Sequence, residues 1–343
     1  MKWMIYGATG YTGELITMHA RRMGYKPVLA GRNKQKIETL ANRAELPWRA
    51  FELDTPDSIA EQLDDIDLII NCAGPFEITA PPMLEACLKA QTHYLDITGE
   101  ISVFELAYSL RKRAVEAGII ICPGVGFDVI PTDCIAARLN AQMPNATHLA
   151  LGFDSSSRMS RGTALTGIRR LGDGGAVRED GKIKDVALAF KTRRINFGDG
   201  DKMAMTIPWG DVATAYYTTE IPNIEVYVPA SPKLIKRMKR LNWIRWGFKI
   251  PLVRQRLEKK LAKQPPGPDK KEREQHYTWV WGEARNAQGD IITLREKVEN
   301  GYTLTSRGSV ELTIYILRNK LQPGFYTPSR LYGAKLIDRF LVT

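Results

Sequence analysis

The sequence predicts an α/β fold, with a doubly wound parallel sheet followed by a second, mixed or antiparallel α+β domain. Two observations predict the sheet: a glycine-rich turn within the first thirteen residues, and apolar strands that alternate with helices up to about Gly126. After Thr147 short strands and glycine turns replace this alternation, which predicts the second domain. The predicted domains are residues 1–130 and 131–327, and the closing segment 328–343 is a candidate for returning to the first domain.

Each element follows from a short apolar run or from an apolar stripe at helical spacing. The strands predicted for the first domain are residues 3–6, 27–30, 51–54, 67–70, 94–97 and 119–122. The predicted helices are 14–24, 34–44, 58–63, 82–90, 103–117 and 132–143, the last linking the two domains. The strands predicted for the second domain include 149–154, 221–228, 277–285, 291–298 and 310–317, and residues 328–341 are expected to form a short helix.

The glycine-rich turn over residues 5–13 has a strand before it and a helix after it, as a Rossmann dinucleotide-binding motif requires. Gly7 permits the tight turn, Gly10 lets the backbone approach a pyrophosphate, and Gly13 lets the helix pack close to the strand. The pyrophosphate would accept from N–H groups at the positive end of the helix dipole. The residues expected to bind the cofactor here are Gly7, Thr9, Gly10, Tyr11, Thr12 and Gly13. A purely structural turn is the alternative.

Arg32 follows the second strand, where NAD-selective sites carry a carboxylate for the ribose 2′-hydroxyl. Its guanidinium suits a 2′-phosphate, so NADP is the expected cofactor, with NAD left open and a solvated surface arginine as the alternative. Asp54, at the end of the predicted third strand, is expected to reach the adenine amino group. The loop after the fourth strand is expected to lie near the nicotinamide half. Its predicted cofactor-binding residues are Asn71, Ala73, Gly74, Pro75 and Phe76.

Composition excludes several classes. The four cysteines show neither a C-x-x-C pair nor zinc spacing, so no metal site is expected and reduced thiols in a cytoplasmic protein are the default. The sequence shows no charged start followed by an apolar run, so no secretory leader is expected. No apolar run is long enough to predict a membrane span.

The formal net charge of +11 is concentrated between Lys233 and Lys263, where twelve Lys or Arg residues stand against one acid, Glu258. Apolar residues recur there at helical spacing, and Trp243 and Trp246 stand among the cations. A basic amphipathic helix of this kind is typical of peripheral binding to an anionic membrane surface. A helical pair packed on its own domain and another partner are the alternatives. Nucleic acid is not expected, because no nucleic-acid fold signature accompanies the charge.

Phrases along nearly the whole chain resemble the saccharopine dehydrogenase-like oxidoreductases. They are residues 7–13, 30–32, 71–76, 94–100, 124–133, 160–164, 208–211 and 322–328. The chain resembles the branch that contains trans-acting enoyl reductases and membrane-associated relatives more than the lysine-pathway enzymes. The resemblance implies an NAD(P)-dependent oxidoreductase with an N-terminal Rossmann domain, a mixed-sheet second domain and a substrate site in the cleft between them.

Hydride transfer also needs a group that takes or gives a proton. Asp128, Tyr94 and Glu100 are the candidates, because each lies near the end of a predicted strand. Asp128 lies in a loop bounded by Gly and Pro, whereas Glu100 has the alternative of a structural role at a helix start capped by Thr98. A polar stretch from Ser160, followed by two arginines, is a candidate grip for an anionic or thioester-linked substrate.

These observations favour an NADP-dependent reductase that acts on an acyl-chain or lipid-like substrate. Two alternatives stay open: an enzyme of a soluble amino-acid or imine substrate, and a sensor that binds NADP without turnover. The expected partners are a small-molecule or acyl-chain substrate and an anionic membrane surface bound through residues 233–263. A homodimer is left open.

Overall fold

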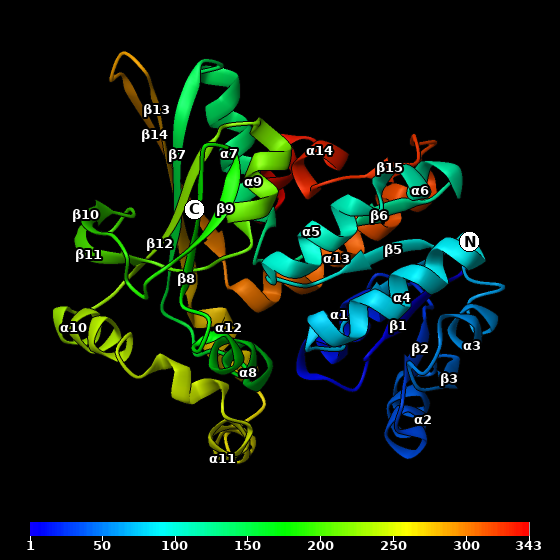
Figure 1. Ribbon diagram of the computed structural model, residues 1–343. Helices are drawn as coiled ribbons and strands as arrows, with labels where there is room; N and C mark the ends of the chain where they lie inside the picture. Colours follow the sequence, from blue (N-terminus) through cyan, green and yellow to red (C-terminus); the bar gives the residue numbers. More distant parts are fainter. Residues whose placement is uncertain (343) are drawn as a thin grey trace. The chain divides into compact units, whose positions relative to one another are not determined.

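The computed structural model describes residues 1–342, and the chain divides into two compact units (Figure 1). The first unit consists of Met1–Ile130 and Tyr302–Gly333, and the second of Pro131–Gly301 and Ala334–Thr343. This corrects the expectation for the C-terminal part: all of 302–327 belongs with the first unit, as do residues 328–333 of the closing segment, whereas the residues from 334 belong with the second. Thr343, the last residue of the expected closing segment, lies outside the described residues.

The first unit contains a seven-stranded sheet in which every pair of neighbouring strands is parallel, with helices on both faces (Figure 1). Its order is β15-β6-β5-β4-β1-β2-β3. The strands are β1 (Trp3–Tyr6), β2 (Val28–Gly31), β3 (Trp48–Ala50), β4 (Leu68–Asn71), β5 (His93–Asp96), β6 (Ile120–Cys122) and β15 (Gly324–Phe325). This confirms the predicted doubly wound sheet. The strand order reverses between β1 and β4, and ligands of such sheets bind beyond the carboxyl ends of the strands at that point.

The helices of the first unit fill the connections between these strands. They are α1 (Tyr11–Arg22), α2 (Lys34–Ala44), α3 (Pro56–Glu61), α4 (Phe76–Ala90), α5 (Ile101–Ser109), α6 (Arg111–Glu116), α13 (Gly301–Arg318) and α14 (Pro328–Tyr332). Helix α4 begins six residues before its predicted start and contains Pro81 and Pro82 in its interior. The single helix predicted over 103–117 is two helices that meet at Leu110.

The third strand lies earlier than the sequence predicts. Residues Trp48–Ala50 pair with Leu29–Gly31, whereas the prediction placed the strand at 51–54. Phe51 follows this strand, with its N–H still donating to the Gly31 carbonyl oxygen at 3.2 Å, and its ring packs against Tyr6 with 5.0 Å between the ring centroids. Asp54 therefore stands in the exposed connection before α3 and does not end a strand.

The strand predicted over 310–317 was wrong, because these residues belong to helix α13. Their alternating apolar residues imitate a strand. The buried positions Thr305, Ser309, Leu312 and Ile316 instead recur every three or four residues, as one face of a helix does. Ser309 can be buried because its hydroxyl donates to the Thr305 carbonyl oxygen at 2.7 Å.

The second unit is built on a mixed, eight-stranded sheet, as predicted. Six strands follow the order β10-β11-β12-β7-β13-β14, and β8 pairs with β12 and β9. The strands are β7 (Ala146–Ser155), β8 (Gly175–Glu179), β9 (Lys182–Val186), β10 (Thr192–Asn196), β11 (Asp201–Thr206), β12 (Asn223–Pro229), β13 (Tyr277–Asn286) and β14 (Ile291–Glu299). The β12–β7 pair is parallel and the other pairs are antiparallel.

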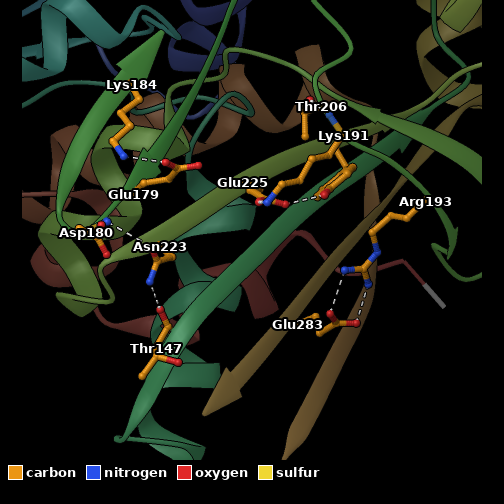
Figure 2. A network of polar contacts seen from close by, with 11 residues as sticks. Thr147, Glu179, Asp180, Lys184, Lys191, Arg193, Thr206, Asn223, Glu225 and Glu283 are labelled. Carbon is orange, nitrogen blue, oxygen red and sulfur yellow. Dashed lines mark hydrogen bonds and ion pairs between the residues drawn. The ribbon is translucent and has the colours of Figure 1, made fainter. Parts of the chain in front are cut away.

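Ion pairs join side chains from different strands of this second sheet (Figure 2). The guanidinium of Arg193 donates to both carboxylate oxygens of Glu283 at 2.9 and 2.6 Å, and Lys191 pairs with Glu225. The Arg193 guanidinium also lies 5.0 Å from the ring centroid of Trp281, which is 2% exposed. The sheet is thus tied together by polar contacts beside a buried aromatic core.

The remaining helices of the second unit include the basic segment. They are α7 (Ile130–Gln142), α8 (Arg161–Arg170), α9 (Asp211–Thr219), α10 (Pro232–Leu241), the 3₁₀ helix η1 (Arg245–Lys249), α11 (Pro251–Ala262), α12 (Lys270–Gln275) and the 3₁₀ helix η2 (Ala334–Phe340). The helix predicted over 328–341 is thus split into α14 and η2. In the described part of the chain, no helix is both long and apolar enough to cross a membrane.

Candidate functional site

The glycine-rich turn joins the ends of three neighbouring strands in the first unit. Gly7 has a φ of 77°, which a side chain disfavours, and its N–H donates to the Ala30 carbonyl oxygen at 2.8 Å. A Cβ on Gly7 would lie 2.8 Å from the backbone nitrogen of Ala73. The turn after β1 therefore packs directly on the loop after β4, with no room for a side chain between them.

Gly10 and Gly13 shape the start of α1. A Cβ on Gly13 would lie 2.4 Å from the Gly7 carbonyl oxygen, so only glycine allows the helix to start so close to β1. Gly10 is the N-cap and provides no side-chain hydrogen bond to the first turn. An uncapped helix start beside a glycine turn fits a pyrophosphate, whose oxygens accept from backbone N–H groups. The residues present therefore fit a dinucleotide.

The connection from β2 to α2 places positive charge beside this turn. Arg32 is exposed there, Asn33 caps α2 by accepting from the Lys36 N–H at 2.9 Å, and Lys36 is exposed one turn further on. A hollow of about 350 Å³ lies alongside. It is lined by Thr9, Glu14, Gln35, Lys36, Thr39, Leu40 and Arg43. Lys36 was not predicted as a site residue, because the pattern that separates NAD from NADP sites concerns the residue at the strand end.

Tyr6 shows which charges surround the end of β1. The pKa of its hydroxyl is raised to about 12, mainly by burial; the positive charge of Arg32 opposes this rise, and the negative charges of Glu52 and Asp54 add to it. Arg32 and Asp54, predicted to bind the two ends of an adenosine, therefore lie close to the same tyrosine.

The loop after β4 is held in place by side chains. Asn71 is buried; its Oδ1 accepts from the Ala73 N–H at 3.0 Å, and its Nδ2 donates to Thr79 Oγ1 at 3.2 Å. The Thr79 hydroxyl in turn donates to the Ala73 carbonyl oxygen at 2.5 Å. These contacts fix the turn that leads through Gly74, Pro75 and Phe76 into α4.

Glu100 is bound to the start of α4. Its two carboxylate oxygens accept from the Phe76 N–H at 3.1 Å and the Glu77 N–H at 2.7 Å, and the residue is 3% exposed. A carboxylate at this place satisfies first-turn N–H groups and interacts favourably with the helix dipole. The structure thus gives Glu100 a positioning part, namely holding the loop predicted to face the nicotinamide.

Tyr94 lies on β5 and is fully buried. Its hydroxyl donates to Asp96 Oδ2 at 2.7 Å, and burial together with the Asp96 charge raises its pKa well above the usual value of 10. Asp96 Oδ1 accepts from the N–H groups of Thr98 at 3.0 Å and Gly124 at 2.9 Å. Burial raises the pKa of Asp96 to about 6 against these hydrogen bonds. The pair ties the end of β5 to the loop after β6.

Asp128 lies in the loop between β6 and α7 and is only partly exposed. A Cβ on Gly99 would lie 3.0 Å from its Oδ2, so the carboxyl packs against the connection that follows β5. Burial raises the pKa of Asp128 to about 7. Burial thus keeps the Asp128 carboxyl protonated to a higher pH than an ordinary aspartate.

Helix α13 supports the Asp128 loop. Thr305 Oγ1 accepts from the Phe127 N–H at 2.9 Å, and the Ser309 hydroxyl donates to the Val125 carbonyl oxygen at 3.0 Å. Tyr302, just after the start of this helix, packs edge-to-face on Tyr11 at 5.2 Å between ring centroids. None of these residues was predicted, because the sequence indicated a strand at 310–317 and no helix before it.

Comparison with known proteins identifies the first unit. Residues 3–122 match the family model described as the saccharopine dehydrogenase NADP binding domain. A saccharopine dehydrogenase-like oxidoreductase of Rattus norvegicus is 28% identical over 203 residues, which cover 51% of this chain and 47% of the relative. A trans-acting enoyl reductase of Mycobacterium ulcerans is 30% identical over 138 residues, 38% of this chain and 33% of the relative. The chain thus spans half or less of the curated relatives it matches.

The fold is similar over the whole chain to that of a solved structure. Apo saccharopine dehydrogenase (L-Glu forming) from Saccharomyces cerevisiae has a TM-score of 0.65 and 12% identity, covering 99% of this chain and 98% of that one. At that identity the likeness concerns the fold alone. It confirms the predicted fold, whereas the match over residues 3–122 confirms the predicted resemblance and the NADP cofactor class. Residues 3–122 thus match the NADP-binding domain of saccharopine dehydrogenases, and the chain is similar to saccharopine dehydrogenase-like oxidoreductases.

Proposed function

We propose that the protein is an NADP-dependent reductase of an acyl-chain or lipid-like substrate, with Asp128 as the proton donor. The observation that carries the proposal is the partly buried carboxyl of Asp128, at the carboxyl edge of the sheet that forms the NADP-binding domain. When bound, NADPH supplies a hydride, and the reduced substrate also needs a proton.

The cofactor would be held by backbone and by charge. The glycine turn offers N–H groups for the pyrophosphate, and Arg32 and Lys36 offer positive charges for the 2′-phosphate. The loop after β4, which Asn71 holds by hydrogen bonds, offers the surface for the nicotinamide. Glu100 keeps that loop in place through the start of α4. The full proposed set is Gly7, Thr9, Gly10, Tyr11, Thr12, Gly13, Arg32, Lys36, Asp54, Asn71, Ala73, Gly74, Pro75 and Phe76.

Asp128 suits proton donation because its pKa lies near neutral pH. An ordinary aspartate is fully ionised at pH 7 and has no proton to give. Asp96 accepts from two backbone N–H groups and the Tyr94 hydroxyl, and Glu100 accepts from two N–H groups at the start of α4, so both of these carboxyls hold backbone in place.

Two observations support an acyl-chain or lipid-like substrate. One is the similarity to the Mycobacterium ulcerans relative, a trans-acting enoyl reductase. The other is the packing of α8 in the second unit. This helix begins after Ser160, in the stretch that is a candidate grip for an anionic or thioester-linked substrate, and Arg169 on it pairs with Glu258 on α11 at 3.0 Å. The candidate grip is thereby attached to the basic segment.

Turnover is tested by following NADPH absorbance with a series of enoyl thioesters of increasing chain length. A soluble 2-oxoacid with an amino acid, which together form an imine, serves as the competing substrate class. We expect oxidation of NADPH with the thioesters and a rate that rises with chain length. Turnover of the imine pair alone would transfer the protein to the amino-acid class, and binding of NADPH without turnover of either would make it a sensor.

The Asp128→Asn variant tests the proton donor. We expect kcat to fall by about 10²–10⁴-fold while the affinity for NADPH stays unchanged. The reductive rate of the parent protein should decline as pH rises through 7, because the carboxyl loses its proton there, and the variant should lack this step. Asp64→Asn, at an exposed position of the same unit, is the matched control. Full activity of Asp128→Asn would contradict the role.

A further inference from the structure

The basic segment, residues 232–263, forms α10, η1 and α11 on the second unit. Leu234 is 39% exposed, whereas Ile235 is 7% exposed and joins a cluster with Ala189 and Ala230, against which Met238 packs. Helix α10 therefore packs on its unit through this apolar cluster, while its Lys and Arg side chains are exposed.

Large apolar side chains stand in solvent where α10 passes into α11. The exposed fractions are 85% for Trp243, 60% for Ile244, 67% for Trp246, 41% for Ile250 and 37% for Val253. We call these five residues the exposed junction. Large apolar side chains gathered at one exposed place mark an interaction surface, since single exposed ones are ordinary but a contiguous group is not.

The backbone that carries the exposed junction is anchored. The side chain of Asn242 accepts from the Leu188 N–H at 2.8 Å and donates to the Leu188 carbonyl oxygen at 3.1 Å. Arg245 donates to the carbonyl oxygens of Asp173 at 3.2 Å and Val186 at 3.4 Å. Trp243 directly follows the anchor Asn242, and Trp246 directly follows the anchor Arg245. Both tryptophans are thus exposed from a backbone that these hydrogen bonds hold in place.

Positive charge flanks the junction. Lys233, Lys236, Arg237, Lys239 and Arg240 are all exposed on α10, and none of them forms an ion pair with another described residue. A hollow of about 440 Å³ lies on this helix and continues to the junction. It is lined by Lys233, Lys236, Arg237, Arg240, Leu241 and Ile244. Its cations and aliphatic side chains together suit a phosphate group joined to an apolar chain.

We propose that the basic segment binds an anionic lipid surface, with Trp243 and Trp246 in the interface and the α10 cations on lipid phosphates. Tryptophan and aliphatic side chains beside Lys and Arg are the composition of interfacial helices, in which apolar burial and charge both contribute to binding. The exposed junction offers aliphatic as well as tryptophan side chains for apolar burial beside the cations, and this combination favours a lipid surface. The proposal does not depend on the reductase activity.

Flotation of the full chain with lipid vesicles tests the proposal. We expect the protein to float with phosphatidylcholine vesicles that contain phosphatidylglycerol, and to stay behind with phosphatidylcholine alone. Salt should weaken this binding only in part, because apolar burial is not screened. Brominated lipids should quench the tryptophan fluorescence of the bound protein, since Trp243 and Trp246 would lie at the depth of the quencher.

Paired variants separate the two contributions. Lys236→Glu with Arg240→Glu should lower the partition coefficient by at least about tenfold, whereas Lys182→Glu with Lys271→Glu, the same charge change at exposed positions of the same unit, should have a small effect. Trp243→Ala with Trp246→Ala should lower binding and remove the quenching. Met23→Ala with Ile291→Ala, at similarly exposed apolar positions, is the control.

Three results would overturn the proposal. They are recovery of the protein in the soluble fraction with both vesicle types at low salt, equal binding to neutral and anionic vesicles, and binding to anionic vesicles that the tryptophan pair does not affect. A fourth result would assign the cations to nucleic acid instead. It is that a soluble DNA duplex displaces the protein from the vesicles, and that the tryptophan variant binds this duplex as well as the parent protein does.

Discussion

The glycine-rich turn and the basic segment use their residues in opposite ways. In the turn, a Cβ on Gly7 or Gly13 would meet backbone atoms at 2.8 and 2.4 Å, so the function of these positions is to have no side chain. In the basic segment, Trp243 is 85% exposed and Trp246 is 67% exposed, so large side chains stand where the fold gives them few neighbours. The comparison teaches that changes in the turn should act on the fold and the cofactor, and changes in the segment on an external partner.

The largest effect is expected from Gly13→Val. The added Cβ would overlap the Gly7 carbonyl oxygen and the Ala8 Cα, which are backbone atoms that cannot move aside independently. We expect the free energy of unfolding to fall by about 4 kcal/mol or more, measured by urea unfolding of the full chain. A variant of normal stability would mean that α1 can shift away from β1, and the contrast between the two regions would be lost.

Gly10→Val sharpens the contrast within the turn itself. A Cβ there would approach only the Gly7 carbonyl oxygen, at 3.2 Å, and the backbone of Gly10 has ordinary extended angles. We expect the fold to survive while the branched side chain blocks the pyrophosphate, with at least a hundredfold loss (about 3 kcal/mol) in NADPH affinity. Equal enhancement of NADPH fluorescence in parent and variant would place the dinucleotide elsewhere.

Arg32→Asp tests the charge of this site, whereas the two glycine variants test its backbone. We expect NADPH binding to weaken by roughly 1.5–3 kcal/mol, since a charge-assisted contact to the 2′-phosphate is lost and a repulsive carboxylate appears. NADH binding should be unchanged or improved. Lys26→Asp, an exposed position before β2 at the opposite edge of the sheet, is the matched control. Equal titration curves for NADPH and NADH with the parent protein would contradict the role of Arg32.

The sequence predicted the parts of the first unit where local pattern and burial agree. Strand β1 and helix α2 have their predicted bounds, because one is a fully buried apolar run and the other has a clear cap at Asn33. The site residues on the strand ends could be predicted in the same way. Topology explains this, since carboxyl ends of parallel strands share one edge.

The supporting parts of the site could not be predicted, because they come from distant segments. Helix α13 presents Thr305 and Ser309 to the loop before Asp128, more than 170 residues earlier in the chain. Several buried positions of this helix are Ser or Thr, whose hydroxyls donate to carbonyl oxygens of the same helix. The apolar residues alone therefore do not show the helical spacing. Likewise, no spacing indicates that Glu100 would reach the start of α4.

The smallest effect on the fold is expected from Trp243→Ala with Trp246→Ala. Both side chains lose little contact when they are truncated, so the free energy of unfolding, followed by circular dichroism in urea, should change by less than about 0.5 kcal/mol. Trp281→Ala is the matched opposite, since Trp281 is 2% exposed against Phe197 and its loss should cost about 3–5 kcal/mol. If the exposed pair proves nearly as costly as Trp281, the two tryptophans are packed against the protein in solution. They would then be unable to enter a lipid surface, and only the cations would remain to bind it.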